Sequence, residues 1–291
     1  MILRITFLFV FFQTLVIAQV SEFPFEESSL LWKIEGPGIK KGAYLFGTMH
    51  LIEKEHFYFP AKLTKIVEKS EALVMELPGL PNQMEAMKYV TLKEGSFFDF
   101  FNEEQTDSIL VWAKDKMGMN EESFRATMSK MKPFVVVQMA TQMQFIGKTE
   151  SYEMTLDKLA KEKGLKVYGL ETVAEQMSFF DKLTPQQQTR MVMDGLEDGD
   201  EAIELTRKMQ DLYKSQHVDS LFMMIQEEGG VLSTEQSTFL DQRNEKWIPQ
   251  IIDLASKQKV FIAVGAGHLG GPNGVIRLLQ KQGYTITPVK L

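Results

Sequence analysis

The chain has 291 residues, no cysteine and a formal net charge of −7 at pH 7. Without cysteine, disulfides and thiolate metal sites are impossible, so a metal ion would have to be held by His, Asp or Glu. The acidic balance gives no electrostatic basis for binding nucleic acid or an anionic membrane surface.

The N-terminal segment has the composition of a signal peptide. Arg4 precedes an apolar run from Ile5 to Ala18, which is short for a membrane span and typical of a signal-peptide core. Val16 and Ala18 fit the small-x-small cleavage rule. We therefore predict that residues 1–18 are removed, leaving a periplasmic or secreted protein without a stable membrane anchor. An uncleaved anchor is the alternative.

The remainder, residues 19–291, is expected to form a single domain, because its length suits one large core and no Pro/Ser/Gly-rich linker interrupts it. Two stretches, about 96–147 and 173–249, have helical patterns and are expected to be helix-rich insertions. Their methionines and phenylalanines are expected to fill a core, since Met packs adaptably; a flexible apolar pocket is the alternative.

Four short and nearly continuous apolar segments predict strands that are buried on both faces. In chain order they are Ala43–Gly47, Ala72–Leu77, Leu165–Leu170 and Lys259–Gly265. A fifth segment, Tyr284–Val289, alternates and contains Pro288, which favours a sheet edge. Helix signals between these strands, such as Pro60 and Gly164, indicate βαβ-type units. The predicted fold class is α/β, with a mainly parallel central sheet.

An ionisable side chain follows each of the four buried strands: His50, Glu76, Glu171 and His268. Both histidines end a Gly-x-x-His-Leu motif, which begins at Gly47 and at Gly265. Because ligands bind at the carboxyl ends of parallel strands, we expect the four side chains to converge there. Two His and two Glu can bind a divalent cation. The glycines are expected to turn the backbone off each strand and to leave room for a ligand.

Each of these residues also has a simpler interpretation. A single histidine after a strand often hydrogen-bonds to backbone, and Glu76 or Glu171 could cap the following helix or pair with a Lys or Arg. The other two histidines, His56 and His217, lie outside such a motif and are expected to be surface residues.

Five segments together resemble the TraB/PrgY/GumN family, the bacterial relatives of the Tiki proteins. They are "YLFGTMHL", "ALVMELP", "EMTLDKLAKEKGLKVYGLETVAEQM", "LDQRNEKWIPQI" and "FIAVGAGHLGGPNGVIRLLQKQGYTITPV". The resemblance runs from about Leu31 to Val289, and the motifs occur in the order expected for the family.

The resemblance implies an α/β protein of the erythromycin-esterase/ChaN-like superfamily. Tiki proteins are regarded as metal-dependent proteases whose site comprises two GxxH motifs and an acidic residue. The family positions fall on the histidines His50 and His268, the strand-end acid Glu76, the "LET" acid Glu171, the pair Arg243 and Asn244, and Glu153, a position often acidic in relatives. Relatives in the superfamily are associated with metal-free ester hydrolysis, haem or iron binding, and pheromone interference.

The first hypothesis is an exported, metal-dependent hydrolase that cleaves a peptide or amide bond. The metal ligands would be drawn from His50, Glu76, Glu171 and His268, and the ion would lower the pKa of a bound water. A carboxylate outside the ligand set would act as general base.

Three further residues would serve the substrate in that hypothesis. Arg243 would stabilise the developing oxyanion or clamp a substrate carboxylate, with a surface ion pair as the alternative. Asn244 would orient a neighbouring group, and Glu153 would contribute to substrate binding. The expected partner is a peptide or small-molecule substrate.

Two other hypotheses use the same residues. In a metal-free esterase, His50 would activate water and Glu76 would orient it. In a protein without enzymatic activity, the same cleft would bind a peptide signal or a haem. No HExxH, GxSxG or Walker motif occurs, so the common metalloprotease, serine-hydrolase and NTPase interpretations lack support.

Overall fold

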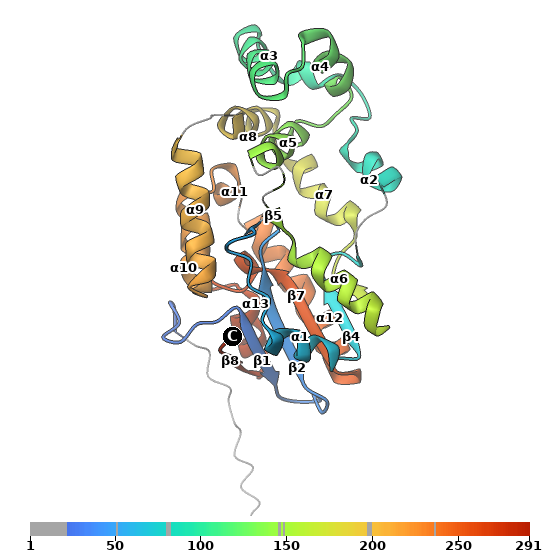
Figure 1. Ribbon diagram of the computed structural model, residues 1–291, viewed down its shortest axis with the longest axis vertical. Coiled ribbons are helices and arrows are strands. Elements are labelled where there is room, and N and C mark those ends of the chain that lie inside the picture. Colours follow the sequence, from blue (N-terminus) through green and yellow to red (C-terminus); the bar gives the residue numbers. More distant parts are fainter. Residues whose placement is uncertain are drawn as a thin grey trace, which may run out of the picture.

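The computed structural model describes residues 22–50, 52–79, 83–144, 147, 149–196, 200–235 and 237–291. The predicted signal peptide, residues 1–18, lies outside the described residues. A six-stranded sheet forms the centre of the molecule, with the strand order β6-β4-β7-β2-β1-β8 (Figure 1). A short two-stranded sheet, β3 (Ile52–Glu53) with β5 (Thr149–Glu150), lies apart from it.

The central sheet is mainly parallel, which confirms the predicted α/β class. β6, β4, β7 and β2 run parallel to one another, while β1 is antiparallel to both β2 and β8. The edge position predicted for the last strand is also confirmed. The strands comprise β1 (Leu31–Glu35), β2 (Ala43–Thr48), β4 (Ala72–Met75), β6 (Lys166–Gly169), β7 (Val260–Gly265) and β8 (Thr285–Pro288).

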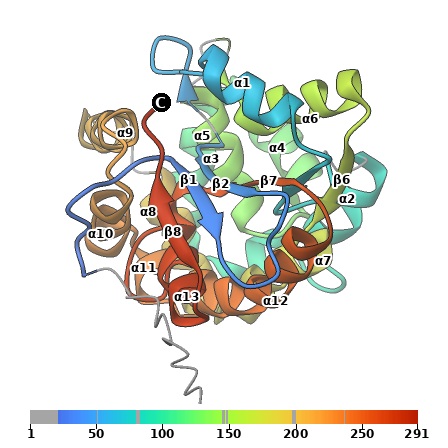
Figure 2. The ribbon, with the colours of Figure 1, turned by 90° about the horizontal axis from the view of Figure 1, so that it is seen from below.

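Helices cover both faces of this sheet (Figure 2). On one face lie α1 (Ala61–Glu68) and α6 (Tyr152–Lys163), and on the other lie α12 (Gln242–Lys257) and α13 (Val275–Lys281). Local chemistry sets the ends of α6, because the Ser151 side chain accepts the Met154 N–H and Gly164 adopts the left-handed conformation that ends a helix.

The two predicted insertions are helical, and most of their length stands above the carboxyl edge of the sheet (Figure 1). The end of the second, from Gln242 on, belongs to α12 on the face of the sheet. A 3₁₀ helix at Phe97–Phe100 and a π-helical turn at Ser237–Asp241 also occur in the insertions. Outside the predicted stretches, α2 (Gln83–Val90) precedes the first insertion. The α-helices of the insertions are α3 (Glu103–Met117), α4 (Glu121–Met128), α5 (Phe134–Gln144), α7 (Val173–Lys182), α8 (Pro185–Leu196), α9 (Asp200–Lys214), α10 (Val218–Glu228) and α11 (Val231–Thr234).

Two principal hydrophobic cores correspond to these two parts. The first joins the sheet to its covering helices and includes Leu45, Val74 and Ile262, which are fully buried. The second lies among α3, α4, α5 and α8 and is built around Phe124 and Met128. The methionines and phenylalanines of the first insertion therefore fill a core of their own.

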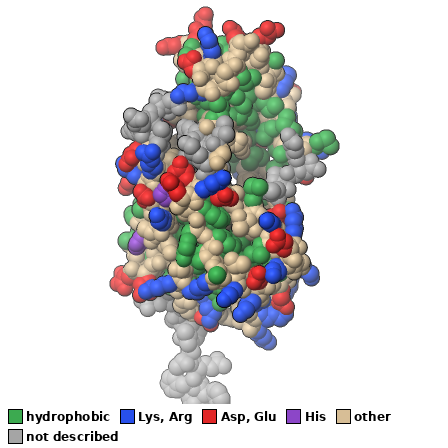
Figure 3. Space-filling view, in the orientation of Figure 1, with side chains coloured by type: hydrophobic (Ala, Val, Ile, Leu, Met, Phe, Trp, Pro, Cys, Tyr) green, Lys and Arg blue, Asp and Glu red, His purple; other side chains and the backbone are tan. Residues whose placement is uncertain are grey.

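In the part of the chain that the structure describes, no helix is both long and apolar enough to cross a bilayer. On the face shown in Figure 3, hydrophobic side chains gather over the helical part, whereas charges of both signs are mixed over the sheet half.

Candidate active site

The four strand-end residues of the sequence prediction lie at the same edge of the sheet. β4 ends before Glu76, β6 before Glu171, and the two strands are hydrogen-bonded neighbours. Their ladder continues past the strand ends, because the Glu171 N–H donates to the Glu76 carbonyl at 2.9 Å. β7 and β2, which precede His268 and His50, follow next in the sheet. The parallel order therefore brings these residues to one edge.

An arginine whose side chain is only 13% exposed joins the two glutamates. Arg243, on α12, donates from Nη2 to Glu76 Oε2 at 2.8 Å and to Glu171 Oε1 at 2.6 Å. Its Nε donates to Glu171 Oε2 at 3.0 Å, so the contact with Glu171 is bidentate. Arg243 also donates to the Phe239 carbonyl. The guanidinium thus forms a buried ion pair with two carboxylates instead of the surface pair considered from the sequence.

The remaining carboxylate positions are held by groups that the sequence did not predict. Gln176, on α7, donates from Nε2 to Glu76 Oε2 at 3.2 Å and to Glu171 Oε1 at 3.0 Å. The Gly265 N–H donates to Glu76 Oε1 at 2.8 Å. One sequence signal points to Gln176: it is a polar residue in the first turns of the helix that follows Glu171.

These contacts decide the charge of each glutamate. Burial disfavours the charged form of Glu76, but His268, His50, Arg243 and the Gly265 N–H outweigh it and lower the pKa of Glu76 to about 2. For Glu171, burial raises the pKa above its usual value, and Arg243 opposes that rise. Glu76 is accordingly a carboxylate at neutral pH.

His268 is buried in the same network. Burial lowers its pKa to about 3, so the ring is neutral at pH 7, and the charges that act on Glu76 near neutrality are those of His50 and Arg243. The ring packs on Trp247, with centroids 4.5 Å apart. Asn244 Oδ1 lies 2.7 Å from His268 Nδ1, consistent with the orienting role expected for Asn244.

His50 has the opposite environment. Its side chain is 66% exposed, and its Nδ1 lies 2.9 Å from Glu153 Oε1. That hydrogen bond raises the pKa of His50 to about 9, so the imidazole is protonated at pH 7. Thr48 and Ser151 each donate a hydroxyl to Glu153, at 2.7 and 3.0 Å, and fix the carboxylate. Glu153, predicted to bind substrate, is therefore the partner of His50.

The two motif glycines are needed for space. Neither Gly47 nor Gly265 has the positive φ that favours glycine in a sharp turn, contrary to the expected turning role. A Cβ on Gly47 would lie 2.8 Å from Leu269 Cδ1 and 3.1 Å from Ala266 Cα, and one on Gly265 would lie 3.2 Å from Glu76 Oε1. Glycine therefore lets the first strand end approach the second motif, and lets Glu76 reach the end of β7.

The arrangement of donor atoms does not fit a metal site built from His50, Glu76, Glu171 and His268. Among the described residues, three or more ligand atoms within 4.8 Å of one another occur only at Glu53, Glu55 and His56, on β3 and the turn after it. Both oxygens of Glu171 are hydrogen-bonded to the Arg243 guanidinium. Ligation by Glu171 would require Arg243 to leave.

The other two histidines differ from each other. His217 is exposed, as expected, and precedes α10. His56 is not a free surface residue, because its side chain is only 17% exposed and its Nδ1 is buried without a hydrogen-bond partner.

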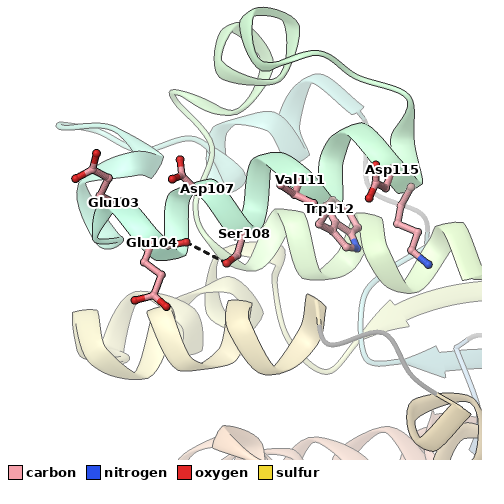
Figure 4. Close-up of a pocket in the computed structure, with 8 residues that line it drawn as sticks. Glu103, Glu104, Asp107, Ser108, Val111, Trp112 and Asp115 are labelled. Atoms are coloured by element: carbon pink, nitrogen blue, oxygen red, sulfur yellow. Dashed lines mark hydrogen bonds between the residues drawn. The ribbon is translucent and has the colours of Figure 1, made fainter.

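A separate surface pocket of about 820 Å³ lies on α3 and contains none of the predicted site residues (Figure 4). Glu103, Glu104, Asp107 and Asp115 surround Val111 and Trp112 there. Because all of its lining residues belong to one helix of the insertion, it is distinct from the candidate active site.

Arg243 is predicted to stabilise the folded protein strongly at neutral pH. Arg243→Met should lower the free energy of unfolding by about 3–5 kcal/mol at pH 7.5, because two buried carboxylates would then face each other without a counter-charge. The loss should shrink toward pH 4.5. Wild-type Glu76, with a pKa of about 2, stays largely ionised over this range and loses its stabilising contribution only as pH falls below about 4.5. The loss shrinks because the unpaired carboxylates of the variant regain stability by taking up a proton.

Urea unfolding at both pH values measures this difference. Arg125→Met, which removes an arginine from an exposed pair with Glu121, is the control and should change stability by less than about 1 kcal/mol. An equal loss at pH 7.5 and pH 4.5 for Arg243→Met would contradict the assignment of charges.

Comparison with known proteins gave one finding, and it covers nearly the whole chain. The TraB/PrgY/gumN family matches residues 30–288. No curated protein and no solved structure matched. The matched range includes β1 to β8 and every residue of the network around Arg243. The chain belongs to the TraB/PrgY/gumN family.

Proposed function

We propose that this family member is a hydrolase that cleaves a peptide or amide bond with a water molecule activated between Glu76 and His268. The observation that carries the proposal is the pair of atoms Glu76 Oε1 and His268 Nε2, which face each other 3.9 Å apart. The side chains around them fix the protonation of both.

The tautomer of His268 follows from its neighbours. Asn244 Nδ2 donates to the Asn273 carbonyl at 2.9 Å, so Asn244 Oδ1 is the atom turned to His268 Nδ1. An amide oxygen only accepts, so Nδ1 carries the proton and Nε2 of the neutral ring carries a lone pair. Glu76 Oε1 is likewise an acceptor, which leaves two acceptors facing each other.

A water molecule satisfies both acceptors, because it can donate one hydrogen to each across a gap of this size. Such a water would have a base at hydrogen-bond distance. His268 Nε2 would take its proton during attack on a carbonyl carbon, and the Glu76 carboxylate would stabilise the imidazolium that forms. In this scheme His268 is the general base and Glu76 orients the water.

His50 would serve as the acid. It is protonated at neutral pH, exposed to solvent and held by Glu153, so it can give a proton to a leaving group from the open side of the site. An amine leaves only when it is protonated, whereas an alcohol depends less on an acid. A protonated His50 therefore favours an amide over an ester substrate.

Arg243 would act indirectly. Its donors face Glu171, Glu76 and the Phe239 carbonyl, and little of its side chain is exposed, so its contribution would be to keep Glu76 ionised and in place. This role replaces contact with the substrate or an oxyanion.

A metal-dependent hydrolase is the second candidate, and the same two acceptor atoms favour it. Glu76 and His268 could be ligands without losing a hydrogen bond. His50 could join them through Nε2 while its Nδ1 keeps the contact with Glu153, whereas Glu171 could join them only by leaving Arg243. No step of the scheme above depends on an ion.

Turnover of a peptide and amide library by purified protein, before and after chelation, separates these candidates. We expect hydrolysis that chelation does not change, and a loss of about 10²–10⁴-fold for His268→Ala, the size of a general acid–base contribution. Exposed His217→Ala is the control and should keep full activity.

The other outcomes are informative. Loss on chelation with recovery on adding a divalent metal would establish the metal-dependent candidate. Binding of a peptide without turnover would support a binding protein. A double His50→Ala/His268→Ala variant with wild-type activity would refute both enzymatic schemes.

The pH dependence of this hydrolysis follows from the two histidines. The base works above the lowered pKa of His268, and the acid works below the raised pKa of His50, so the profile should be a broad bell. Glu153→Gln removes the carboxylate that raises the pKa of His50. Its alkaline limb should therefore move to lower pH, while the acid limb stays in place. An alkaline limb that Glu153→Gln leaves unmoved would show that His50 is not the acid.

Export is proposed from the apolar segment before Ala18 alone. We expect the protein recovered from the periplasm or the medium to begin at Gln19, as N-terminal sequencing would show. A cytoplasmic product that retains Met1 would contradict this proposal.

A further inference from the structure

A second buried ion pair lies on the other side of the loop that carries His268. Arg277, on α13, and Asp219, on α10, have side chains only 3% and 4% exposed. The guanidinium donates from Nη1 to Asp219 Oδ1 at 2.8 Å and from Nη2 to Asp219 Oδ2 at 2.9 Å. Fully buried charges are stable only when they are paired in good geometry, so this pair fixes α10 relative to α13.

This pair holds the loop by its backbone. The N–H of Gly271, three residues after His268, donates to Asp219 Oδ1 at 2.8 Å, and its carbonyl accepts from Arg277 Nη1 at 3.1 Å. Gly271 has φ +82°, and a Cβ there would lie 2.6 Å from the Phe222 ring. The loop is therefore fixed on this side by Asp219 and Arg277, while the His268 ring is fixed on the other by Asn244.

The same two side chains also hold the N-terminal segment, residues 22–25. The Phe25 N–H donates to Asp219 Oδ2 at 2.7 Å, and the Glu22 carbonyl accepts from Arg277 Nη2. The guanidinium carbon of Arg277 lies 3.7 Å from the centroid of the Phe25 ring, which covers it. A little further along, Ser28 Oγ accepts the Val218 N–H at the start of α10.

Phe25 and Gly271 therefore use opposite oxygens of one carboxylate. We propose that Asp219 and Arg277 are positioning residues for His268. In this proposal, binding of residues 22–25 to the pair is needed for it to hold the loop from His268 to Gly271 in place. The segment that follows the expected cleavage point then contributes to the geometry of the site although it lies outside it. A looser segment would let the pair and Gly271 shift together, and the His268 ring would follow.

Only the activity measurement described below rests on the proposed function. The structural readout needs no substrate. Ring ¹H–¹⁵N spectra of the four histidines distinguish an Nδ1–H tautomer from the Nε2–H form, and a His268→Gln variant assigns the signal.

Phe25→Ala is the first test variant, because it removes the cover of the guanidinium and keeps the backbone N–H. Phe98→Ala is the matched control. Phe98 is also a half-buried ring under an arginine, with Arg125 at 4.5 Å, but it lies in the helical insertion. Arg277→Lys is the second test variant. Lysine keeps the positive charge but lacks the two guanidinium nitrogens that donate to Asp219 and Gly271.

In wild-type protein the His268 signal should show the single Nδ1–H tautomer. Phe25→Ala and Arg277→Lys should shift or broaden that signal and introduce the second tautomer, while the exposed His217 signal stays unchanged. Phe98→Ala should lower the melting temperature without changing the His268 signal. Where hydrolysis is measurable, Phe25→Ala should lower kcat by about tenfold or more with little change in KM, as expected for a misplaced base.

A His268 signal that keeps its wild-type position in both Phe25→Ala and Arg277→Lys would overturn the inference and leave the pair a purely structural one. Because this result is independent of turnover, it would not bear on the proposed function. Absence of hydrolysis in wild-type protein, together with the expected change at His268, would refute the function and keep the positioning role.

Discussion

The guanidinium of Arg243 makes it possible to bury two carboxylates side by side at the carboxyl edge of the sheet. Glu76 and Glu171 follow neighbouring parallel strands, so their side chains lie close together. Without a counter-charge in this low-dielectric interior, one of the two carboxylates would have to take up a proton. With Arg243 and Gln176 between them, Glu76 stays ionised and keeps Oε1 for the Gly265 N–H and the side facing His268. The ion pairs that Arg243 makes from α12 therefore both keep Glu76 charged and attach α12 to the end of the sheet.

The two Gly-x-x-His motifs place their histidines in opposite environments. His268 is enclosed beside Trp247 and is kept neutral by burial, whereas His50 is open to solvent and is kept protonated by Glu153. A pair of titratable groups whose pKa values are moved apart is the arrangement that acid–base chemistry requires. The repeated motif therefore supplies two different groups, and the helices that contact each of them decide which group is the base.

Much of the fold could be predicted because the strands are short apolar runs with helix signals between them. Among the described elements, β1, the small β3–β5 pair and α2 were not predicted. The strand-end residues were predicted for the same reason, since parallel strands share one ligand-binding edge. Contacts from distant helices were not predictable: Gln176 reaches Glu76 across 100 residues, and Glu153 reaches His50 across 103. No local pattern showed that Arg243 would face inward or that His268 would be enclosed, because both depend on how α12 packs.

The most direct test of the central claim is to identify what binds between Glu76 Oε1 and His268 Nε2. A crystal structure at neutral pH, with anomalous data collected at the absorption edges of the common divalent metals, would identify it. We expect a single water within hydrogen-bond distance of both atoms, no anomalous signal, and Arg243 bridging the two glutamates. An anomalous peak ligated by His268 and His50, with the Arg243 side chain displaced from Glu171, would contradict the account and establish a metal site.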